Sequence, residues 1–456
     1  MEEGIKEEFN YDEVLAYIGQ FGKFQKKIFI WLWLVSGVTG LSVVTFGFTA
    51  YTPNYRVATE CDLMNSSYNF DTDSFSVPFW FRNKNDNISL DLRNQDCRIP
   101  SVEKNDEGEC VNVYFSNESI EINSSDINQL IFDRTIMRST LVEEYQFVCD
   151  RSYIRPYISA LFMLGMLFGS FLFGFLSDTF GRIKTLMLAI LWLSMAGFLG
   201  SFCMGTSGVI GFGVLRVLTG MGCTGSYIAA FVLGIEHVGY KFTMLMGIAF
   251  VIPFAVGEAV FGIEAYLIRE WQILQIVAYL PIALLLAVYW CVPESVRWLV
   301  AHNKFDQAKS IIRRVAKENG RECPEHLLKH LTPMDDKPIS TKTTRKTTIL
   351  DLFSTRLILT RSLNMFFQWF SVTMCYYGLT SASTTSFAGD VYGNFLLSVL
   401  IEIPSYLFCI FLMDIWGRRP ILSFCQIISG VSCIIIAFLE GSNLQGVEVL
   451  ITVGFS

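Results

Sequence analysis

Charged side chains are scarce in this sequence: Asp, Glu, Lys and Arg make up only 17% of its 456 residues, against 52% apolar residues. Soluble globular proteins are about 25% charged. Histidine is scarcer still, and the spacing of the four histidines does not suggest a metal site. The shortage of charge excludes an ordinary soluble domain, and we expect neither a metal nor any other cofactor.

The sequence also lacks the motifs of an enzyme. It contains no nucleophile elbow, no Walker phosphate loop and no paired catalytic constellation, so we expect neither catalysis nor transport driven by ATP hydrolysis. It has no cleavable signal peptide, because the N-terminus is acidic and the first apolar run, 28–50, is too long for one. The net charge of −7 is unevenly spread and does not point to nucleic acid.

Apolar segments of about 20 residues, the length that crosses a bilayer as a helix, recur along the chain. They predict an all-α membrane protein. A last apolar segment begins near Gly446 and stops at Ser456, too short to cross. Gly165, Gly169 and Gly220 are expected to let helices approach closely in lipid. The predicted spans are 28–50, 154–176, 185–204, 208–233, 243–267, 272–292, 358–380, 390–413 and 421–439.

The segment 51–153, between the first two spans, has the features of an extracellular domain. It holds 18 acidic against 9 basic residues and four Asn-x-Ser sequons, and we find no sequon elsewhere. Its four cysteines predict two disulfides in an oxidising compartment, with three possible pairings. The predicted glycosylation sites are Asn65, Asn87, Asn117 and Asn123, and the disulfide cysteines are Cys61, Cys97, Cys110 and Cys149.

Basic residues mark the segments that we expect in the cytoplasm. The stretch 294–361 holds 14 basic against 8 acidic residues, and lysines end the N-terminal segment 1–27. The positive-inside rule therefore places both in the cytoplasm. Within 294–357, the stretch Phe305–Ala316 has apolar residues at helical spacing, which predicts an amphipathic helix at the membrane surface.

One short motif occurs twice, 236 residues apart. Asp178-Thr-Phe-Gly-Arg182 and Asp414-Ile-Trp-Gly-Arg418 share the pattern Asp-x-aromatic-Gly-Arg, and each joins two apolar segments. Many transporters are built from internal repeats of this kind. We therefore divide the chain into an N-terminal half, 28–293, and a partial C-terminal half, 358–456.

Together these motifs resemble the organic cation, anion and carnitine transporters of the major facilitator superfamily. The similarity includes Gly-Gln-Phe-Gly-Lys-Phe-Gln at 19–25, Arg216-Val-Leu-Thr-Gly220, the Pro-Glu-Ser motif from Pro293, and Ile401-Glu-Ile-Pro404. Thr179, Ile415 and Val296 depart from the family pattern. The resemblance implies a helical bundle of two pseudo-symmetric halves, the second incomplete, with about nine or ten of twelve transmembrane helices.

The resemblance also implies alternating access across the plasma membrane, gated by charged residues at the cytoplasmic side. Arg216 is the only arginine inside a span of the first half, and we expect it to lock the gate rather than bind substrate. The predicted gating residues are Asp178, Gly181, Arg182, Arg216, Glu236, Glu294, Arg297, Asp414, Gly417 and Arg418.

Candidate substrate-binding residues are ionisable or aromatic side chains at membrane depth. Glu402 lies mid-span, where a lone carboxylate costs several kcal/mol unless it is paired, protonated or solvated. Trp369, Thr373, Tyr376 and Thr380 share one helix face, which suits organic cations through cation–π contact or serves ordinary packing. The predicted set is Trp369, Thr373, Tyr376, Tyr377 and Glu402; Glu258 and Glu264 are weaker candidates.

We predict a secondary transporter of small organic cations or zwitterions, carnitine-like ones included. No Lys or Arg lies between Arg361 and Arg418, which disfavours the alternative of an organic anion carrier. A second alternative is a truncated isoform that does not transport, suggested by the end at Ser456. The expected partners are the organic ion, the lipid bilayer and either a coupling ion or none.

Overall fold

The protein is described here from a computed structural model. Several predictions fall on residues that it does not describe: the segment from Gly446, and the side chains of Cys61, Cys97, Cys110, Asp414, Thr380 and all four sequon asparagines. Cys149 is disulfide-bonded, while the pairing of the cysteines stays a prediction. The structure describes residues 11–57, 98–104, 110–119, 130–323, 325–328, 331, 353–383 and 391–440.

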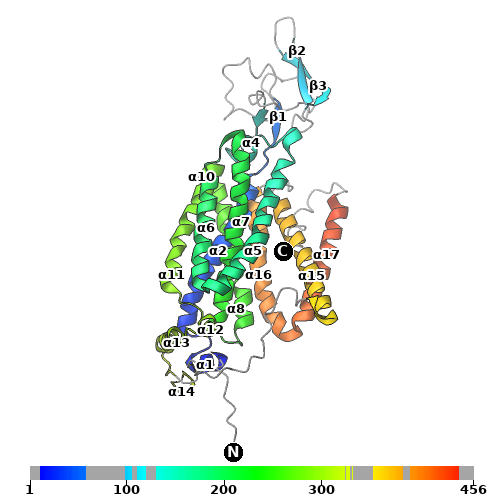
Figure 1. Ribbon diagram of the computed structural model, residues 1–456. Coiled ribbons are helices and arrows are strands. Elements are labelled where there is room, and N and C mark those ends of the chain that lie inside the picture. The colour runs from blue at the N-terminus through cyan, green and yellow to red at the C-terminus, as the bar shows by residue number, and fades with distance from the viewer. Residues whose placement is uncertain are drawn as a thin grey trace, which may run out of the picture.

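The N-terminal half is a bundle of six apolar helical segments (Figure 1). The first four are single helices, and each spans its predicted segment to within five residues at either end. They are α2 (Lys23–Thr49), α5 (Ile154–Phe180), α6 (Arg182–Gly200) and α7 (Gly205–Glu236).

The fifth and sixth segments are interrupted helices. The fifth consists of α8 (Thr243–Ala249) and α9 (Ile252–Ile268), and Pro253 in the first turn of α9 explains the break. A proline lacks the N–H that a continuous helix needs. The sixth runs through α10 (Trp271–Tyr279), the 3-10 helix η3 (Leu280–Ala287) and α11 (Val288–Cys291), with a proline opening η3.

Glycines bring the helices of this half into close contact. A Cβ at Gly165 of α5 would lie 2.1 Å from the Val217 carbonyl oxygen of α7, and one at Gly220 would lie 2.2 Å from that of Phe162. A Cβ at Gly257 of α9 would meet the Gly37 carbonyl of α2. The predicted close approach at Gly165 and Gly220 is confirmed, since no larger residue fits there.

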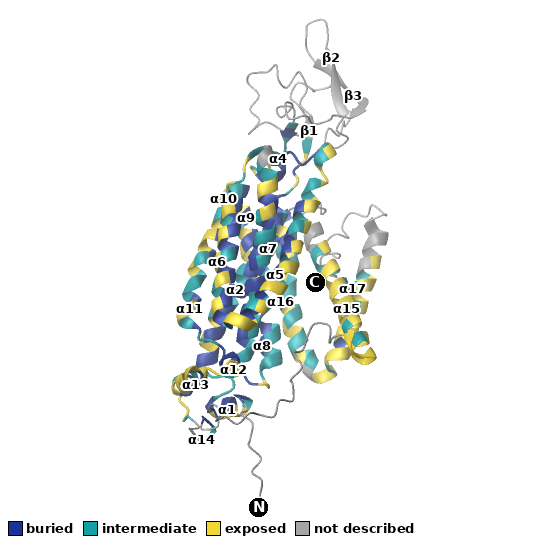
Figure 2. Ribbon diagram, in the orientation of Figure 1, coloured by how far each residue is buried: buried dark blue, intermediate teal, exposed yellow. Residues whose placement is uncertain are grey.

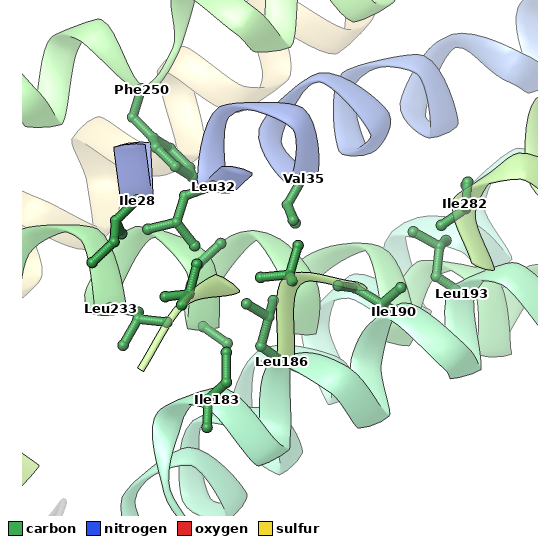
Figure 3. Close-up of a cluster of buried hydrophobic side chains, with 14 of the residues drawn as sticks. Ile28, Leu32, Val35, Ile183, Leu186, Ile190, Leu193, Leu233, Phe250 and Ile282 are labelled. Carbon is green, nitrogen blue, oxygen red and sulfur yellow. The ribbon is translucent and has the colours of Figure 1, made fainter. Parts of the chain in front are cut away.

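A continuous apolar core fills the middle of this half (Figure 3). Side chains from α2 and α6 face each other there, and Phe250 and Ile282 enter from the two interrupted segments. The labelled core residues are Ile28, Leu32, Val35, Ile183, Leu186, Ile190, Leu193, Leu233, Phe250 and Ile282. Buried residues accordingly concentrate in this bundle (Figure 2).

The C-terminal half contributes three long helices among the described residues: α15 (Arg356–Ser383), α16 (Val391–Trp416) and α17 (Arg418–Glu440). Helix α16 packs on the N-terminal bundle, chiefly against α9, while α15 and α17 stand beside it (Figure 1). Among the described residues, seven helical segments are long and apolar enough to cross a membrane, and α16 is the one from this half. The more polar α15 and α17 still cover the predicted spans 358–380 and 421–439.

Short strands gather at one end of the bundle, which we call the strand end (Figure 1). Strand β1 (Tyr55–Val57) pairs antiparallel with β4 (Leu130–Phe132), with Tyr55 opposite Phe132. Strand β2 (Arg98–Lys104) pairs antiparallel with β3 (Cys110–Ser119). Helix α4 (Leu141–Tyr145) and the 3-10 helix η2 (Cys149–Arg151) lead into α5. The segment predicted to be a separate small domain thus has a strand framework of its own.

Short helices cover the opposite end, which we call the helical end (Figure 1). They are α1 (Tyr11–Ile18), α12 (Val296–Ala301), α13 (Phe305–Asn319) and α14 (Glu325–Leu328). The expectation that α13 lies on the membrane surface is wrong in one respect. Ala308, Ile312 and Val315 are buried in the same core as Leu15 and Ile18 of α1, so the apolar face of α13 covers protein rather than lipid.

Candidate functional site

A buried carboxylate on α9 faces the C-terminal half. Glu258 is only 1% exposed, on the helix face that also buries Phe261 and Gly262. A Cβ at Gly262 would lie 2.9 Å from the Phe395 ring of α16, so this face is the one that packs on the C-terminal half. The Tyr376 hydroxyl of α15 donates a hydrogen bond to Glu258 Oε1 at 3.1 Å.

A second carboxylate approaches the same place from α16. The Tyr406 hydroxyl donates to Glu402 Oε2 at 2.7 Å, and the Tyr376 hydroxyl also contacts the Glu402 carboxylate. Tyr376 therefore lies between a carboxylate of each half. In the part of the chain that the structure describes, neither Glu258 nor Glu402 forms an ion pair with a basic side chain. Two carboxylates and two phenols therefore meet at this place without a described basic partner.

Aromatic rings of the N-terminal half border these acids. Tyr227 of α7 lies in the neighbourhood of the hydroxyls of Tyr377 and Tyr406. The Tyr227 ring packs edge-on against Phe250 and Phe254, with centroids 5.4 and 6.0 Å apart. Rings beside carboxylates suit an organic ammonium group, because the negative face of a ring attracts a cation.

The predicted substrate-binding residues do not all lie at this site. Tyr376 and Glu402 meet there, and Tyr377 packs edge-on against Tyr376, with centroids 5.4 Å apart. Trp369 is 67% exposed, and Thr373 is exposed as well. The structure therefore brings Tyr376 and Tyr377 of α15 to the carboxylates and leaves Trp369 and Thr373, nearer the start of the helix, exposed.

Sequence reasoning missed Tyr406 and gave Glu258 too little weight. Tyr406 follows Glu402 by four residues, a spacing that places both on one helix face, so the signal was present. Ser398 and Ser405, four residues before and three after Glu402, donate to the backbone carbonyls of Asn394 and Ile401 at 3.0 and 3.1 Å. Both hydroxyls therefore form hydrogen bonds within α16.

Arg216 of α7 is buried inside the N-terminal half, away from the other predicted gating residues. Its guanidinium lies between the rings of Phe46 and Phe162, 4.8 and 4.6 Å from their centroids. It also interacts with the Tyr279 hydroxyl, which donates to the Ser42 carbonyl at 3.4 Å. The contacts join α7 to α2, α5 and α10.

The first copy of the doubled motif forms an ion-pair cluster at the helical end. Arg182 pairs with Asp178 and with Glu236, whose Oε1 is 3.2 Å from Arg182 Nη2. Arg182 Nη1 also donates to Ser177 Oγ at 3.1 Å. The Trp298 indole donates to the Asp178 carbonyl at 2.8 Å, which ties α12 to α5.

Glu294 caps the N-terminus of α6 in the same cluster. Its Oε1 accepts the backbone N–H groups of Arg182, Ser295 and Ile183 at 2.9, 3.0 and 3.3 Å. Burial raises the pKa of Glu294 above its ordinary value of 4.5, while these backbone hydrogen bonds oppose the rise. Gly181 leaves room for the carboxylate, since its Cβ would come within 2.4 Å of Glu294 Oε2.

The remaining gating candidates lie apart from this cluster. Arg297, which the resemblance places in it, instead pairs with Asp12 of α1 at 2.8 Å. In the second copy of the motif, Gly417 has a φ of +84°, comparable to +110° at Gly181, and Arg418 is exposed. The two copies therefore share a turn geometry, but only the first has described ion pairs around its arginine.

Aromatic contacts join the two halves towards the strand end. Tyr392 of α16 stacks on Phe48 of α2 with centroids 5.6 Å apart, and Phe395 meets Phe48 edge-on at 4.9 Å. The Tyr392 hydroxyl donates to the Ile136 carbonyl at 2.9 Å. Here the halves and the segment after β4 are in direct contact.

Known proteins resemble this chain over most of its length. A model of the family "Sugar (and other) transporter" matches residues 71–456. Organic cation/carnitine transporter 2 of Homo sapiens is 31% identical over 461 residues, covering 98% of this chain and 78% of that protein. An organic cation transporter protein of Drosophila melanogaster is 30% identical over 436 residues, covering 94% and 75%.

A solved structure has the same fold. The xylose transporter XylE from E. coli, in a partially occluded inward open conformation, matches with a TM-score of 0.58 at 13% identity. The match covers 95% of this chain and 83% of that one. At this identity the likeness concerns the fold alone, and it confirms the helical bundle predicted from the sequence.

Proposed function

The chain belongs to the sugar and other transporter family of the major facilitator superfamily, and from this premise we propose that it carries small organic cations or zwitterions across the plasma membrane. The names of its relatives support this substrate class. The strand end would face the outside and the helical end the cytoplasm, in keeping with the acidic sequon-bearing segment at one end and the basic segment at the other.

The observation that carries the proposal is the meeting of Glu258 and Glu402 around Tyr376. A carboxylate at membrane depth costs several kcal/mol without a counter-charge. Among the described residues no basic side chain supplies this counter-charge. The ammonium group of a bound substrate would supply it instead. The rings around Tyr227 would hold its apolar substituents.

The position of the site suits alternating access. Glu258 lies on the N-terminal half, whereas Tyr376, Glu402 and Tyr406 lie on the C-terminal half. A cation bound between them would contact both halves, so its binding energy would depend on how the halves are arranged. The Arg182 cluster and the contacts of Tyr392 would form gates at the two ends.

Uptake measurements test this proposal. Cells expressing the chain should accumulate a labelled quaternary ammonium compound or carnitine more than a labelled aromatic anion. Glu258→Gln and Glu402→Gln should each reduce cation uptake by about tenfold or more, because each removes a buried charge partner. Glu264→Gln is the matched control, since Glu264 lies on the same helix as Glu258 and outside the paired site.

Two results would contradict the proposal. One is anion uptake that is insensitive to Glu402→Gln. The other is an equal loss of cation uptake in Glu264→Gln and Glu258→Gln at equal surface expression. Repeating the uptake across an imposed pH gradient tests a proton as the coupling ion, because a proton-coupled carrier would respond to the gradient and an uncoupled one would not.

A further inference from the structure

A cavity of about 430 Å³ opens at the helical end, where α1, α2 and α13 meet. Its volume lies in the range of about 300–1,000 Å³ that is usual for small-ligand sites. It is remote from the paired carboxylates, which lie among α9, α15 and α16. Its lining includes Lys23, Lys26, Arg321, Asn319, Phe21 and Phe242.

The charge of the lining has one sign. Lys23, Lys26 and Arg321 all line the cavity, and no carboxylate does. The three cations are exposed, and none has an ion pair within the described residues. Lys26 Nζ lies 5.7 Å from the centroid of the Phe21 ring, which stacks on Phe242 at 5.5 Å. Three cations around one opening favour an anionic ligand.

The wall of the cavity is built by Asn319, the last residue of α13. Its Oδ1 accepts the Phe24 N–H at 3.0 Å, and its Nδ2 donates to the Ile18 carbonyl at 2.9 Å and to Gln25 Oε1 at 3.1 Å. A Cβ at Gly22 would lie 2.3 Å from Asn319 Oδ1, so glycine is required for this contact. The cavity therefore has a fixed shape before any ligand arrives.

A left-handed turn brings the third cation to the same opening. Gly320 has a φ of +66°, and the Arg321 N–H bonds to the Ala316 carbonyl at 2.9 Å, which ends α13. Arg321 thereby reaches the start of α2, although nearly 300 residues separate it from Lys26.

The exposed face of α2 sets the depth of the cavity in the membrane. Ile30 is 59% exposed and lies one helical turn beyond Lys26. An exposed apolar side chain on a spanning helix is suited to a lipid-facing position, and that position would put Lys26 at the boundary where headgroup phosphates are found. Basic pockets between helices at the cytoplasmic side bind anionic headgroups.

We propose that this cavity binds the phosphate groups of an anionic ligand, with Lys23, Lys26 and Arg321 as its cationic contacts. A phospholipid headgroup of the adjacent leaflet or a soluble phosphorylated compound offers this chemistry. The bound phosphates hold the end of α13 against the start of α2, and so fasten the short helices to the N-terminal half.

Binding of phosphatidylinositol 4,5-bisphosphate to the purified 456-residue chain tests this site. The protein is reconstituted in phosphatidylcholine nanodiscs with and without that lipid, and soluble inositol trisphosphate serves as the second probe. The double variant Lys26→Gln/Arg321→Gln is compared with Lys309→Gln/Lys317→Gln, which removes two cations from α13 outside the cavity.

We expect the cavity variant to bind the phosphoinositide about 30-fold more weakly than the wild type, since each cation near a membrane surface is worth about fivefold. The control variant should change binding less than twofold, and both should keep the thermal midpoint. Binding of the lipid alone identifies a headgroup site, and equal binding of inositol trisphosphate identifies a soluble phosphate ligand. Equal weakening in the two double variants, or no binding of either probe, overturns the proposal.

Discussion

The Tyr376 hydroxyl donates a hydrogen bond to Glu258 Oε1 at 3.1 Å and so links a helix of the C-terminal half to a buried carboxylate of the N-terminal half. The two residues are 118 positions apart in the sequence. The same hydroxyl contacts Glu402, so one phenol joins both acids of the proposed cation site.

Tyr376→Phe should therefore weaken substrate binding while leaving the ring in place. Loss of a partner for a buried polar group costs about 1–3 kcal/mol, so we expect the KM for a quaternary ammonium substrate to rise about tenfold. Tyr377→Phe is the control, because it removes the adjacent hydroxyl and keeps the bond to Glu258. A larger effect at Tyr377 than at Tyr376 would place the substrate elsewhere.

Glu294 should make stability depend on pH in a defined direction. Burial raises its pKa above 4.5 in the folded protein, so protonation favours the folded state between 4.5 and that higher value. As the pH falls from neutral through this interval, the thermal midpoint of the wild type should rise relative to that of Glu294→Gln. A constant difference between the two proteins across the interval would show that Glu294 does not titrate there.

The two motif glycines should differ in their tolerance of alanine. Both have positive φ, which costs a residue with a Cβ about 1–2 kcal/mol. At Gly181 the Cβ would also meet Glu294 Oε2 at 2.4 Å, whereas no described residue lies within 4 Å of a Cβ at Gly417. Gly181→Ala should therefore lower the thermal midpoint and the folded yield more than Gly417→Ala does. The reverse order would contradict the capping role of Glu294.

Tyr392 offers a graded test of the contact at the strand end. Tyr392→Phe loses the hydrogen bond to the Ile136 carbonyl, at a cost of about 1 kcal/mol, and keeps the stacking on Phe48. Tyr392→Ala loses both, and aromatic pairing adds about 0.5–1.5 kcal/mol. The thermal midpoint should be highest for the wild type, lower for Tyr392→Phe and lowest for Tyr392→Ala. Identical midpoints for all three would mean that this contact does not hold the halves together.

The sequence by itself determined where the long helices of this protein lie. Helices α5 and α16 begin at Ile154 and Val391, at or next to the predicted starts, because bilayer thickness sets how long an apolar run must be. The doubled motif located two tight turns at Gly181 and Gly417, because a positive φ favours glycine wherever the chain turns that way.

Only the tertiary structure decided which of these residues meet. Arg297 pairs with Asp12 rather than joining the Arg182 cluster, and the apolar face of α13 packs on α1 instead of lipid. The pairing of Tyr376 with Glu258 likewise depends on where α15 lies relative to α9. Helix length and turn position follow from neighbouring residues, whereas such pairs depend on how distant helices cross, which local sequence does not encode.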